Sequence, residues 1–377
     1  MAYDKVVDSA SLDSKLTQVA DAIRTKGNTS ADLQFPSGFI SAIQAIQTGV
    51  ELKIVVSVTS GATVTATKGS KVVSGTAVNG TCTLTVPEAG TWSVKATRNG
   101  QTSDTKSVTF TDSYTVSLGF VSSVLNNNDW NTIKTVSDAG QGANYWSIGD
   151  RKAVTLNGTV GALTLSNYTT YAFIIGFKHN ASVEGANRIH FQLGKTALSG
   201  GTDVALCDSY YNNTGGGFRM NISNSNSDGW ASSNMRTAIC GTNLSSYSGT
   251  IIAVIPAALR AVLKSVTKYT NNTGNSTAAS AVTATTDYFF LLSEYEVFGS
   301  TTYANSNEAS KQAQYSYYSA GNSKAKYNHS ATSTAVGWWL RSPFASSSTG
   351  FVRVLTDGTV ETDDAYYSRG FASGFCV

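Results

Sequence analysis

The sequence predicts an α+β protein of several domains, with N-terminal helices, a small antiparallel β-sandwich and a C-terminal domain that mixes helices and strands. Apolar residues recur at helical spacing before residue 50, alternate with polar residues from 51 to 118, and follow no single period afterwards. The 377 residues exceed the length of most single domains. We therefore expect domains at residues 1–50, 51–118 and 119–377.

Two short amphipathic helices are expected in the first domain. One occupies about 11–26 and ends at Gly27, and the other follows Pro36 and ends at Gly49. Their apolar faces consist of Leu12, Leu16, Val19, Ala20 and Ile23, and of Phe39, Ile40, Ile43 and Ile46. Two such helices cannot bury both faces alone. They form either a hairpin packed on the same chain or an attachment and oligomerisation segment, and both alternatives stay open.

Residues 51–118 carry short runs of alternating apolar and polar residues, separated by Asn-Gly and Glu-Ala-Gly turns. This pattern predicts an antiparallel sandwich whose core includes Val64, Leu84, Val86, Trp92 and Val94. Nothing polar in the segment suggests catalysis. We interpret it as a spacer of immunoglobulin-like shape.

The C-terminal domain is expected to contain both kinds of element. "NNNDWNTIKTVSDAGQGANYWSIGDRKAVTLNG" predicts a helix, a loop and strands, and "PAALRAVLKSVTKYT" predicts a helix that begins at Pro256. "YAFIIGFKHN", "RIHFQLGK" and "DYFFLLSEYEVFGS" predict strands, the last followed by a turn. Two polar tracts, "DSYYNNTGGGFRMNISNSNSDGW" and "SYYSAGNSKAKYNHSATSTA", predict long loops, which often carry function.

Composition excludes several classes of partner and location. A net charge of +3 over the whole chain gives no basic patch for nucleic acid. The first ten residues lack an apolar signal-peptide core, and the most apolar tract contains Pro256 and Arg260, so we expect no secretory signal and no membrane insertion. The four cysteines, Cys82, Cys207, Cys240 and Cys376, have no metal or redox spacing and are expected to be reduced and mostly buried.

No catalytic or metal-binding pattern emerges from the residues. His179, His190 and His329 are the three histidines, and none belongs to a known catalytic or zinc motif. Glu294 and Glu296 alternate in an expected strand, so they should face opposite sides and not share acid–base work. Neither "NNNDW" nor "SNSNSDGW" matches an EF-hand calcium loop. We expect no catalytic residue, no metal and no cofactor.

Three segments carry resemblances to known families. "LDSKLTQVADAIRTKGNTSADLQFPSGFISAI" is similar to the N-terminal segment of tail-associated proteins of phages that infect Gram-positive hosts, and "ATVTATKGSKVVSGTAVNGTCTLTVPEAGTWSVKATRNGQTS" resembles the immunoglobulin-like spacer that often follows it. "ANYWSIGDRKAVTLNG", "FFLLSEYEVFG" and "GWWLRSPFASSSTGFVRVLTDGTV" resemble a C-terminal C-type lectin-like domain of the formylglycine-generating-enzyme-like branch. That domain is used as the variable protein of diversity-generating retroelements, which rewrite chosen codons near the 3′ end of the gene.

The last resemblance implies that residues 338–377 form a variable region on a fixed scaffold. The scaffold would consist of Trp338, Trp339, Leu340, Arg341, Val352, Val354 and Gly358. The exposed, changeable ligand-binding residues would be Phe344, Ser346, Ser347, Ser348, Phe351, Arg353, Leu355, Asp363, Asp364, Tyr366, Tyr367 and Ser368. Cys376 stands alone at the end of the chain, and this departure from the cysteine chemistry of the branch argues against oxidase activity.

The residues themselves also permit a plainer interpretation of this region. "FVRVLTDGTVET" alternates like a hairpin around Asp357-Gly358, so Phe351 is either a packed strand residue or part of the surface, with Arg353 on the solvated face. The serine and aspartate positions fit a solvated loop as well as a contact. Tyr366 and Tyr367 are adjacent and should point in different directions, so at least one is expected to be exposed.

Together these observations predict a non-enzymatic adhesin of a phage tail tip or tail fibre, made in the host cytoplasm and located in the virion. Its N-terminus would bind other tail proteins and form a homo-oligomer, with a trimer expected from the resemblance alone. Its C-terminal surface would recognise a protein or glycan of the host-cell surface. The alternatives are a fixed carbohydrate-binding or structural decoration module and an enzyme acting on cell-surface glycans, which would need a carboxylate pair in a groove.

Overall fold

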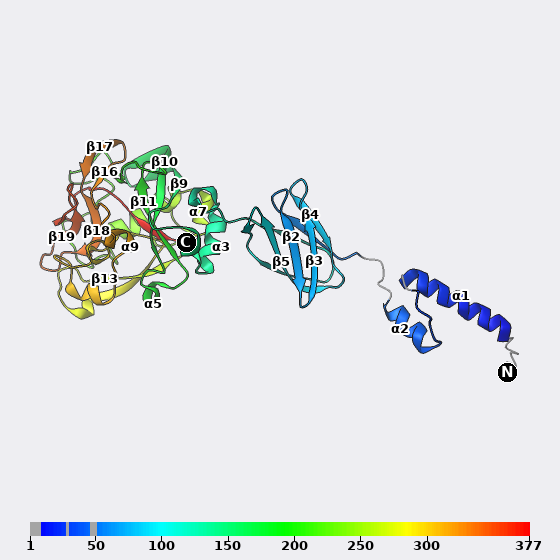
Figure 1. The fold of residues 1–377 in the computed structure, drawn as a ribbon. Helices are drawn as coiled ribbons and strands as arrows, with labels where there is room; N and C mark the ends of the chain where they lie inside the picture. Colours follow the sequence, from blue (N-terminus) through cyan, green and yellow to red (C-terminus); the bar gives the residue numbers. More distant parts are fainter. Residues whose placement is uncertain (1–8, 28–29, 46–50) are drawn as a thin grey trace. The chain divides into compact units, whose positions relative to one another are not determined.

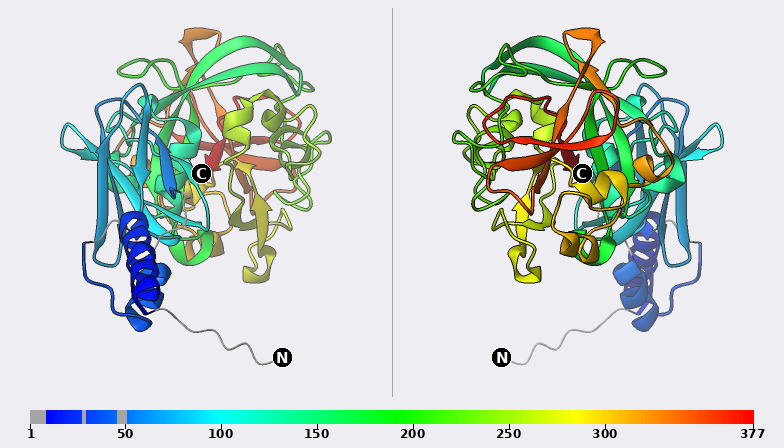
Figure 2. Two further views of the ribbon diagram at one scale, coloured as in Figure 1. Left: turned by 90° about the vertical axis from the view of Figure 1, so that its right-hand side faces the viewer. Right: turned by 90° about the vertical axis from the view of Figure 1, so that its left-hand side faces the viewer.

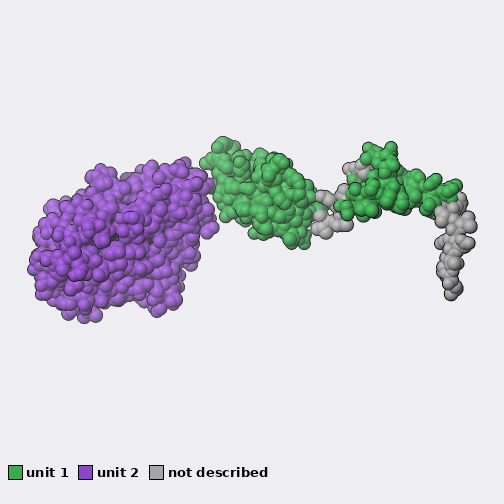
Figure 3. All heavy atoms as spheres, turned by 90° about the horizontal axis from the view of Figure 1, so that it is seen from below, with its two compact units in different colours: residues 1–120 green, residues 121–377 purple. Residues whose placement is uncertain are grey.

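The computed structural model describes residues 9–27, 30–45 and 51–377, which divide into two compact units, Met1–Phe120 and Val121–Val377 (Figures 1 and 3). Helices and strands both contribute, with strands in the majority, so the α+β class is confirmed. None of the helices in these described residues is long and apolar enough to cross a membrane.

The first unit begins with the two expected helices, α1 (Ser9–Gly27) and α2 (Ser37–Ala45), which lie side by side in both views of Figure 2. Their contact is small and buries Ala20, Ile23 and Phe39. Much of the apolar surface expected on them stays exposed, namely Leu12, Val19, Ile40 and Ile43, and Ile46 lies outside the described residues.

Eight strands follow in two sheets. They are β1 (Lys53–Ser57), β2 (Thr63–Lys68), β3 (Lys71–Thr76), β4 (Thr81–Thr85), β5 (Gly90–Arg98), β6 (Gln101–Thr102), β7 (Lys106–Phe110) and β8 (Tyr114–Ser117). One sheet has the order β4-β1-β8, and the other has the order β3-β2-β5 with β6 and β7 both paired to β5.

The alternating residues of these strands bury one face of each sheet around a common core. All five residues expected in this core are buried, with Trp92 fully enclosed. Asn79-Gly80 and Asn99-Gly100 adopt positive φ at both residues, as the expected Asn-Gly turns require.

The second unit contains short helices and thirteen strands. Its helical segments are η1 (Leu125–Asn127), α3 (Trp130–Asp138), α4 (Gly142–Tyr145), α5 (Ala181–Glu184), η2 (Met235–Cys240), α6 (Ile251–Val254), α7 (Ala257–Arg260), η3 (Ala279–Ala281), α8 (Glu294–Phe298), η4 (Ser306–Ser310) and α9 (Ser316–Ser319). Its strands are β9 (Arg151–Val160), β10 (Leu163–Phe177), β11 (Ile189–Lys195), β12 (Val204–Ala205), β13 (Val266–Asn271), β14 (Val282–Asp287), β15 (Phe289–Phe290), β16 (Lys326–Asn328), β17 (Ala331–Val336), β18 (Trp338–Pro343), β19 (Gly350–Val354), β20 (Val360–Asp364) and β21 (Gly374–Cys376).

An antiparallel sheet of order β15-β21-β11-β10-β9 forms the centre of this unit, and β18-β19-β20 form a second antiparallel sheet. The expected helix after "NNND" is α3, which begins where the Asp129 carboxylate accepts a hydrogen bond from Thr132 N at 2.6 Å. The expected strands in "YAFIIGFKHN" and "RIHFQLGK" are β10 and β11. All four cysteines are free and buried, as expected.

Three expected elements are wrong. The tract 316–335, expected as a long loop, contains α9, β16 and most of β17. The helix expected from Pro256 ends at Arg260, and the rest of the expected helix includes β13, which begins at Val266. Val266, Lys268 and Thr270 are buried on one side of this strand, which pairs with β14. "SEYEVFG" is not a strand but α8: Ser293 and Glu296 form a reciprocal capping box, and Gly299 ends the helix in a left-handed conformation.

Candidate ligand-binding surface

The "WWLRSP" motif is the whole of β18, and all six of its residues are buried. The two indole N–H groups are satisfied by backbone carbonyls, Trp338 donating to Lys324 O at 2.9 Å and Trp339 to Phe218 O at 3.1 Å. The motif therefore ties together segments that are far apart in the sequence. The expected burial of the tryptophans is confirmed, and Leu340 and Arg341 are buried with them; their role as a fixed scaffold stays a prediction.

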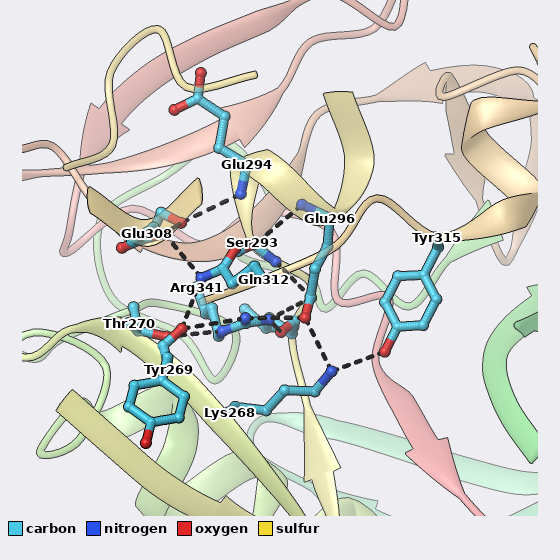
Figure 4. Close-up of polar contacts among 12 residues, drawn as sticks. Lys268, Tyr269, Thr270, Ser293, Glu294, Glu296, Glu308, Gln312, Tyr315 and Arg341 are labelled. Carbon is cyan, nitrogen blue, oxygen red and sulfur yellow. Dashed lines mark hydrogen bonds and ion pairs between the residues drawn. The ribbon is translucent and has the colours of Figure 1, made fainter. Parts of the chain in front are cut away.

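Arg341 is fully buried and fixed on every side (Figure 4). Its Nη1 and Nη2 donate to the two carboxylate oxygens of Glu296, at 2.5 and 3.0 Å, and its Nε donates to Thr270 Oγ1 at 2.8 Å. A buried ion pair of this kind is tolerated only when its remaining donors are also bonded. The pair locks β18 to α8 and β13.

Lys268 extends this network to a second carboxylate. Its Nζ lies 2.7 Å from Glu184 Oε2, 2.9 Å from Glu296 Oε1 and 2.8 Å from the Tyr315 hydroxyl. Burial raises the pKa of Glu184 to about 7 although Lys268 opposes it. Burial likewise disfavours the charge on Glu296, but Arg341 and Lys268 outweigh it and hold the pKa of Glu296 below its ordinary value.

The cluster around Lys268 includes atoms that could bind a metal ion, but the Lys268 ammonium group already lies against its two carboxylates. His179, Glu184 and Glu296 offer ligand atoms within 4.8 Å of one another. Lys268 bonds to both carboxylates and supplies the positive charge that a metal would bring. A divalent ion added beside Lys268 and Arg341 would leave uncompensated buried positive charge. We therefore interpret this cluster as structural.

Cys376 is not isolated, which corrects the expectation from sequence. Its Sγ lies 3.2 Å from His190 Nδ1, and both side chains are fully buried. Burial raises the pKa of Cys376 to about 12, and burial and Lys268 lower the pKa of His190 well below its ordinary value. At neutral pH both groups are therefore uncharged and enclosed, unlike an activated thiolate.

Glu294 and Glu296 do not face opposite sides of a strand, because both lie in α8 and both are buried. The Glu294 carboxylate accepts hydrogen bonds from the backbone N–H groups of Tyr303 and Ala304, at 3.1 and 2.7 Å. Glu296 is held instead by Arg341 and Lys268. Each carboxylate therefore has its own set of partners.

The expected ligand-binding residues divide into three groups by exposure. Ser346 and Ser348 are exposed. The partly buried members are Phe344, Ser347, Arg353, Leu355, Asp363, Asp364, Tyr366 and Tyr367. Phe351 and Ser368 are buried. The expected exposure of Ser368 is therefore wrong, and Phe351 is the packed strand residue that the alternating pattern allowed, not a surface residue. Phe351 is covered because both faces of β19 are packed, and Ser368 is covered because its hydroxyl donates to Asp208 Oδ1 at 2.9 Å.

The expected hairpin around Asp357-Gly358 is present as β19 and β20, with Val354 opposite Val360. Gly358 adopts a φ of +88°, which a side chain would strain. Arg353 and Asp363 lie on this hairpin as an ion pair at 3.1 Å, and Arg369 Nε donates to the same Asp363 oxygen at 2.5 Å. Asp363 thus holds two arginines and is less free for a ligand than a solvated loop residue.

Tyr366 and Tyr367 follow this hairpin and are both partly exposed, with ring centroids 5.0 Å apart. The Arg369 guanidinium lies 5.1 Å from the centroid of the Tyr367 ring, within cation–π distance. Together with Ser346 and Ser348, these tyrosines are the sequence-predicted residues best placed to meet a ligand.

The binding site predicted from the sequence does not include a segment that lies next to it in the structure. Residues 208–229, recognised only as a polar loop, pair with the backbone of residues 365–369, and Asn226 is buried beneath the turn at 344–350. The Asn226 amide Nδ2 lies 3.1, 2.7 and 2.8 Å from the carbonyl oxygens of Phe344, Ser347 and Gly350. The polarity of the loop was visible in the sequence, but its partner more than 100 residues away was not.

No curated protein and no solved structure matches the chain. Residues 204–377, which contain both the 208–229 loop and the β18-β19-β20 sheet, are similar to the family described as a domain of unknown function (DUF6273).

Proposed function

We propose that this protein is a non-enzymatic receptor-binding protein, an adhesin of a phage tail tip or tail fibre whose C-terminal surface is diversified by a retroelement. The observation that carries the proposal is the contrast within residues 338–377. Arg341 and the two tryptophans are immobilised in the core, whereas Ser346, Ser348 and the Tyr366–Tyr367 pair reach solvent. Tyrosine and serine are favoured in recognition loops because they combine contact area with adaptable hydrogen bonding.

The finer folds belong to the same proposal. We assign an immunoglobulin-like sandwich to residues 51–118, supported by two sheets that enclose Trp92. We assign a C-type lectin-like fold to residues 119–377, supported by the motifs that carry the resemblance and by the buried frame they form. In this arrangement the sandwich is a spacer and the terminal domain presents the ligand-binding surface.

The N-terminal helices would attach the protein to other tail proteins and assemble copies of it, and the proposed location of the protein is the virion. Repeated copies raise the effective affinity of a weak single site by orders of magnitude. The ligand would be a protein or glycan of the host-cell surface. A fixed carbohydrate-binding or decoration module is the alternative, and it needs the same scaffold but no variation.

Binding to cells tests the proposal directly. Fluorescent beads carrying the biotinylated full chain are incubated with intact cells of a panel of Gram-positive gut bacteria, and labelling is measured by flow cytometry. The double variant Tyr366→Ala/Tyr367→Ala should require at least about tenfold more protein for half-maximal labelling, as loss of hot-spot aromatics does. Tyr145→Ala, which truncates an exposed tyrosine elsewhere, is the matched control.

If wild-type beads label none of the cells, the adhesin proposal is wrong. If wild-type beads label cells and beads with the double variant label them equally, the assignment of the ligand-binding surface is wrong but the adhesin proposal still holds. Deep sequencing of codons 338–377 in a population that carries the gene then separates the two alternatives. Substitutions clustered at the exposed positions, with a near-copy template in flanking DNA, support diversification, and an invariant stretch without a template favours the fixed module.

A further inference from the structure

The 208–229 loop encloses the segment that carries the two tyrosines. In residues 208–217, the first arm of the loop, Gly215 N donates to Tyr366 O at 3.2 Å, and Thr214 forms an antiparallel bridge with Tyr367. In residues 218–229, the second arm of the loop, Asn221 N donates to Ala365 O at 2.9 Å, and Phe218 O accepts from Arg369 N at 3.0 Å. Residues 365–369 therefore lie between the two arms.

Buried polar groups hold the loop in this position. Asp208 accepts hydrogen bonds from Ser368 Oγ at 2.9 Å and from Gly217 N at 2.6 Å. At the far end of the loop, Asn226 N donates to Ser348 O at 2.8 Å, in addition to the three carbonyl contacts of its side chain. Gly229 has a φ of +52°, and a Cβ there would meet Asn271 O at 2.1 Å, so the loop end is closely packed. The loop is thus part of the fold that presents the tyrosines.

The same loop exposes two large apolar side chains to solvent. Tyr210 is 48% exposed and Ile222 is 68% exposed. Among residues 121–377, all of which the structure describes, the other large apolar side chains of comparable exposure are Val124, Tyr145 and Leu198. Ile222 follows Asn221, which bonds to Ala365, and Tyr210 packs beside Gly216, one residue after the contact with Tyr366. Both therefore lie close to the segment that carries Tyr366 and Tyr367.

We infer that the 208–229 loop is the second half of the ligand-binding surface, and that the ligand is a protein with an apolar patch that covers Tyr210 and Ile222. This inference rests on the proposed function, because it concerns the ligand of the same surface. Burying the exposed part of the Ile222 side chain is favourable, and that gain is absent while it faces water. Aromatic residues and arginine are enriched at protein interfaces, and this surface combines three tyrosines with the partly exposed Arg353.

A glycan fits these groups less well. Sugar hydroxyls require hydrogen-bonding partners, and Ile222, the most exposed large apolar residue of the unit, offers none. Tyr210 and Ile222 also lie outside the residues proposed to vary. They would supply a constant apolar contact, while Ser346, Ser348, Tyr366 and Tyr367 select among ligands that share it.

The experiment uses the wild-type-labelled cells and the variants Tyr210→Ala and Ile222→Ser. Each should raise the protein concentration for half-maximal labelling by at least about tenfold, as truncation of interface anchors does. The matched controls are Tyr145→Ala and Leu198→Ser, whose side chains are 36% and 46% exposed. All four variants should keep the wild-type unfolding temperature within about 2 °C, because substitutions at exposed positions rarely change stability much. Proteinase K treatment of the cells should abolish labelling, and periodate oxidation of their glycans should not.

The outcomes separate this inference from the proposed function. In one outcome, Tyr366→Ala/Tyr367→Ala loses labelling while Tyr210→Ala and Ile222→Ser label cells fully. This result overturns the role of the loop and still supports the adhesin proposal. Labelling that survives proteinase K and disappears with periodate overturns the protein ligand. Failure of the wild type to label cells overturns both. Equal loss with the control variants shows a non-specific effect and also rejects the loop as a site.

Discussion

His179 and His190 are buried beside Lys268, and their chemistry is set by that position. His179 stacks on the Tyr315 ring at 3.7 Å between centroids, and His190 Nδ1 lies 3.1 Å from the Tyr315 hydroxyl. Burial and the charge of Lys268 lower the pKa of His179 from 6.5 to about 3, and they lower that of His190 well below 6.5. Both side chains are therefore neutral in the folded protein over the physiological range.

This depression predicts how stability changes with pH. Below pH 6.5 the unfolded chain takes up a proton on His179 and the folded chain does not, so this stabilisation is present above pH 6.5 and is lost as pH falls toward 3. Each such histidine contributes a slope of about 1.4 kcal/mol per pH unit. Glu184 acts in the opposite direction: its folded pKa of about 7, against 4.5, contributes stability at low pH that is lost as pH rises through 7.

The variant His179→Phe isolates one histidine while keeping an aromatic ring against Tyr315. We would measure its free energy of unfolding by urea denaturation, with fluorescence of the buried tryptophans. As pH falls from 6.5 to 4.5, the variant should become more stable than the wild type by about 1.4 kcal/mol for each pH unit, because it lacks the histidine that the unfolded chain protonates. The control Tyr145→Phe, at an exposed site, should run parallel to the wild type. Parallel curves for His179→Phe would show that this histidine is protonated equally in both states.

At the scale of elements, the sequence predicts structure best where the pattern is local. The alternating strands of residues 51–118, their Asn-Gly turns and helices α1, α2 and α3 all follow from spacing and end signals within a few residues. The hairpin β19–β20 was predictable for the same reason, since Asp357-Gly358 interrupts two alternating runs.

Prediction fails where distant contacts decide the conformation. Val266–Asn271 continues an apparent helical pattern, but pairing with β14 makes it a strand. The α8 helix is only five residues long, too short for a clear helical period, although Ser293 and Glu296 were readable as a capping box. Elements of this length are specified by their ends and not by their periodicity.

The candidate surface was predictable in part, for a related reason. The resemblance led us to expect the turn with Ser346 and Ser348 and the two tyrosines at the surface, and they are exposed or partly exposed. It also led us to expect Ser368 there, which is buried, and the alternating pattern did not decide whether Phe351 is packed. A two-residue period indicates which side a strand residue faces, not whether another segment covers that side. The loop that covers Ser368 joins it through Asp208, at a separation of 160 residues, so no local signal marks the contact.

At the scale of the whole molecule, the N-terminal helices differ from the two larger cores in how little they bury. Their shared cluster contains Ala20, Ile23 and Phe39, with Leu16, Leu33 and Ala42 packed against it. Leu12, Val19, Ile40 and Ile43 stay exposed on the same two helices. Isolated helices of this length are marginal in water, and their stability usually comes from packing an apolar face. The exposed apolar residues therefore favour association over a self-sufficient hairpin.

We expect the full chain to self-associate through the exposed apolar residues of α1 and α2. Multi-angle light scattering after size exclusion should give a homo-oligomer, with a trimer the state expected from the resemblance to tail proteins, and the double variant Leu12→Ser/Ile43→Ser should shift it to monomer. Val72→Ser, which changes a similarly exposed apolar residue on β3, is the matched control and should leave the mass unchanged. Labelling by the free, bead-less protein should fall with the double variant by about a hundredfold or more, because a monomer loses the gain from linked sites. A wild type that is monomeric at micromolar concentration would contradict self-association and leave the proposed attachment role as the alternative for these exposed apolar residues.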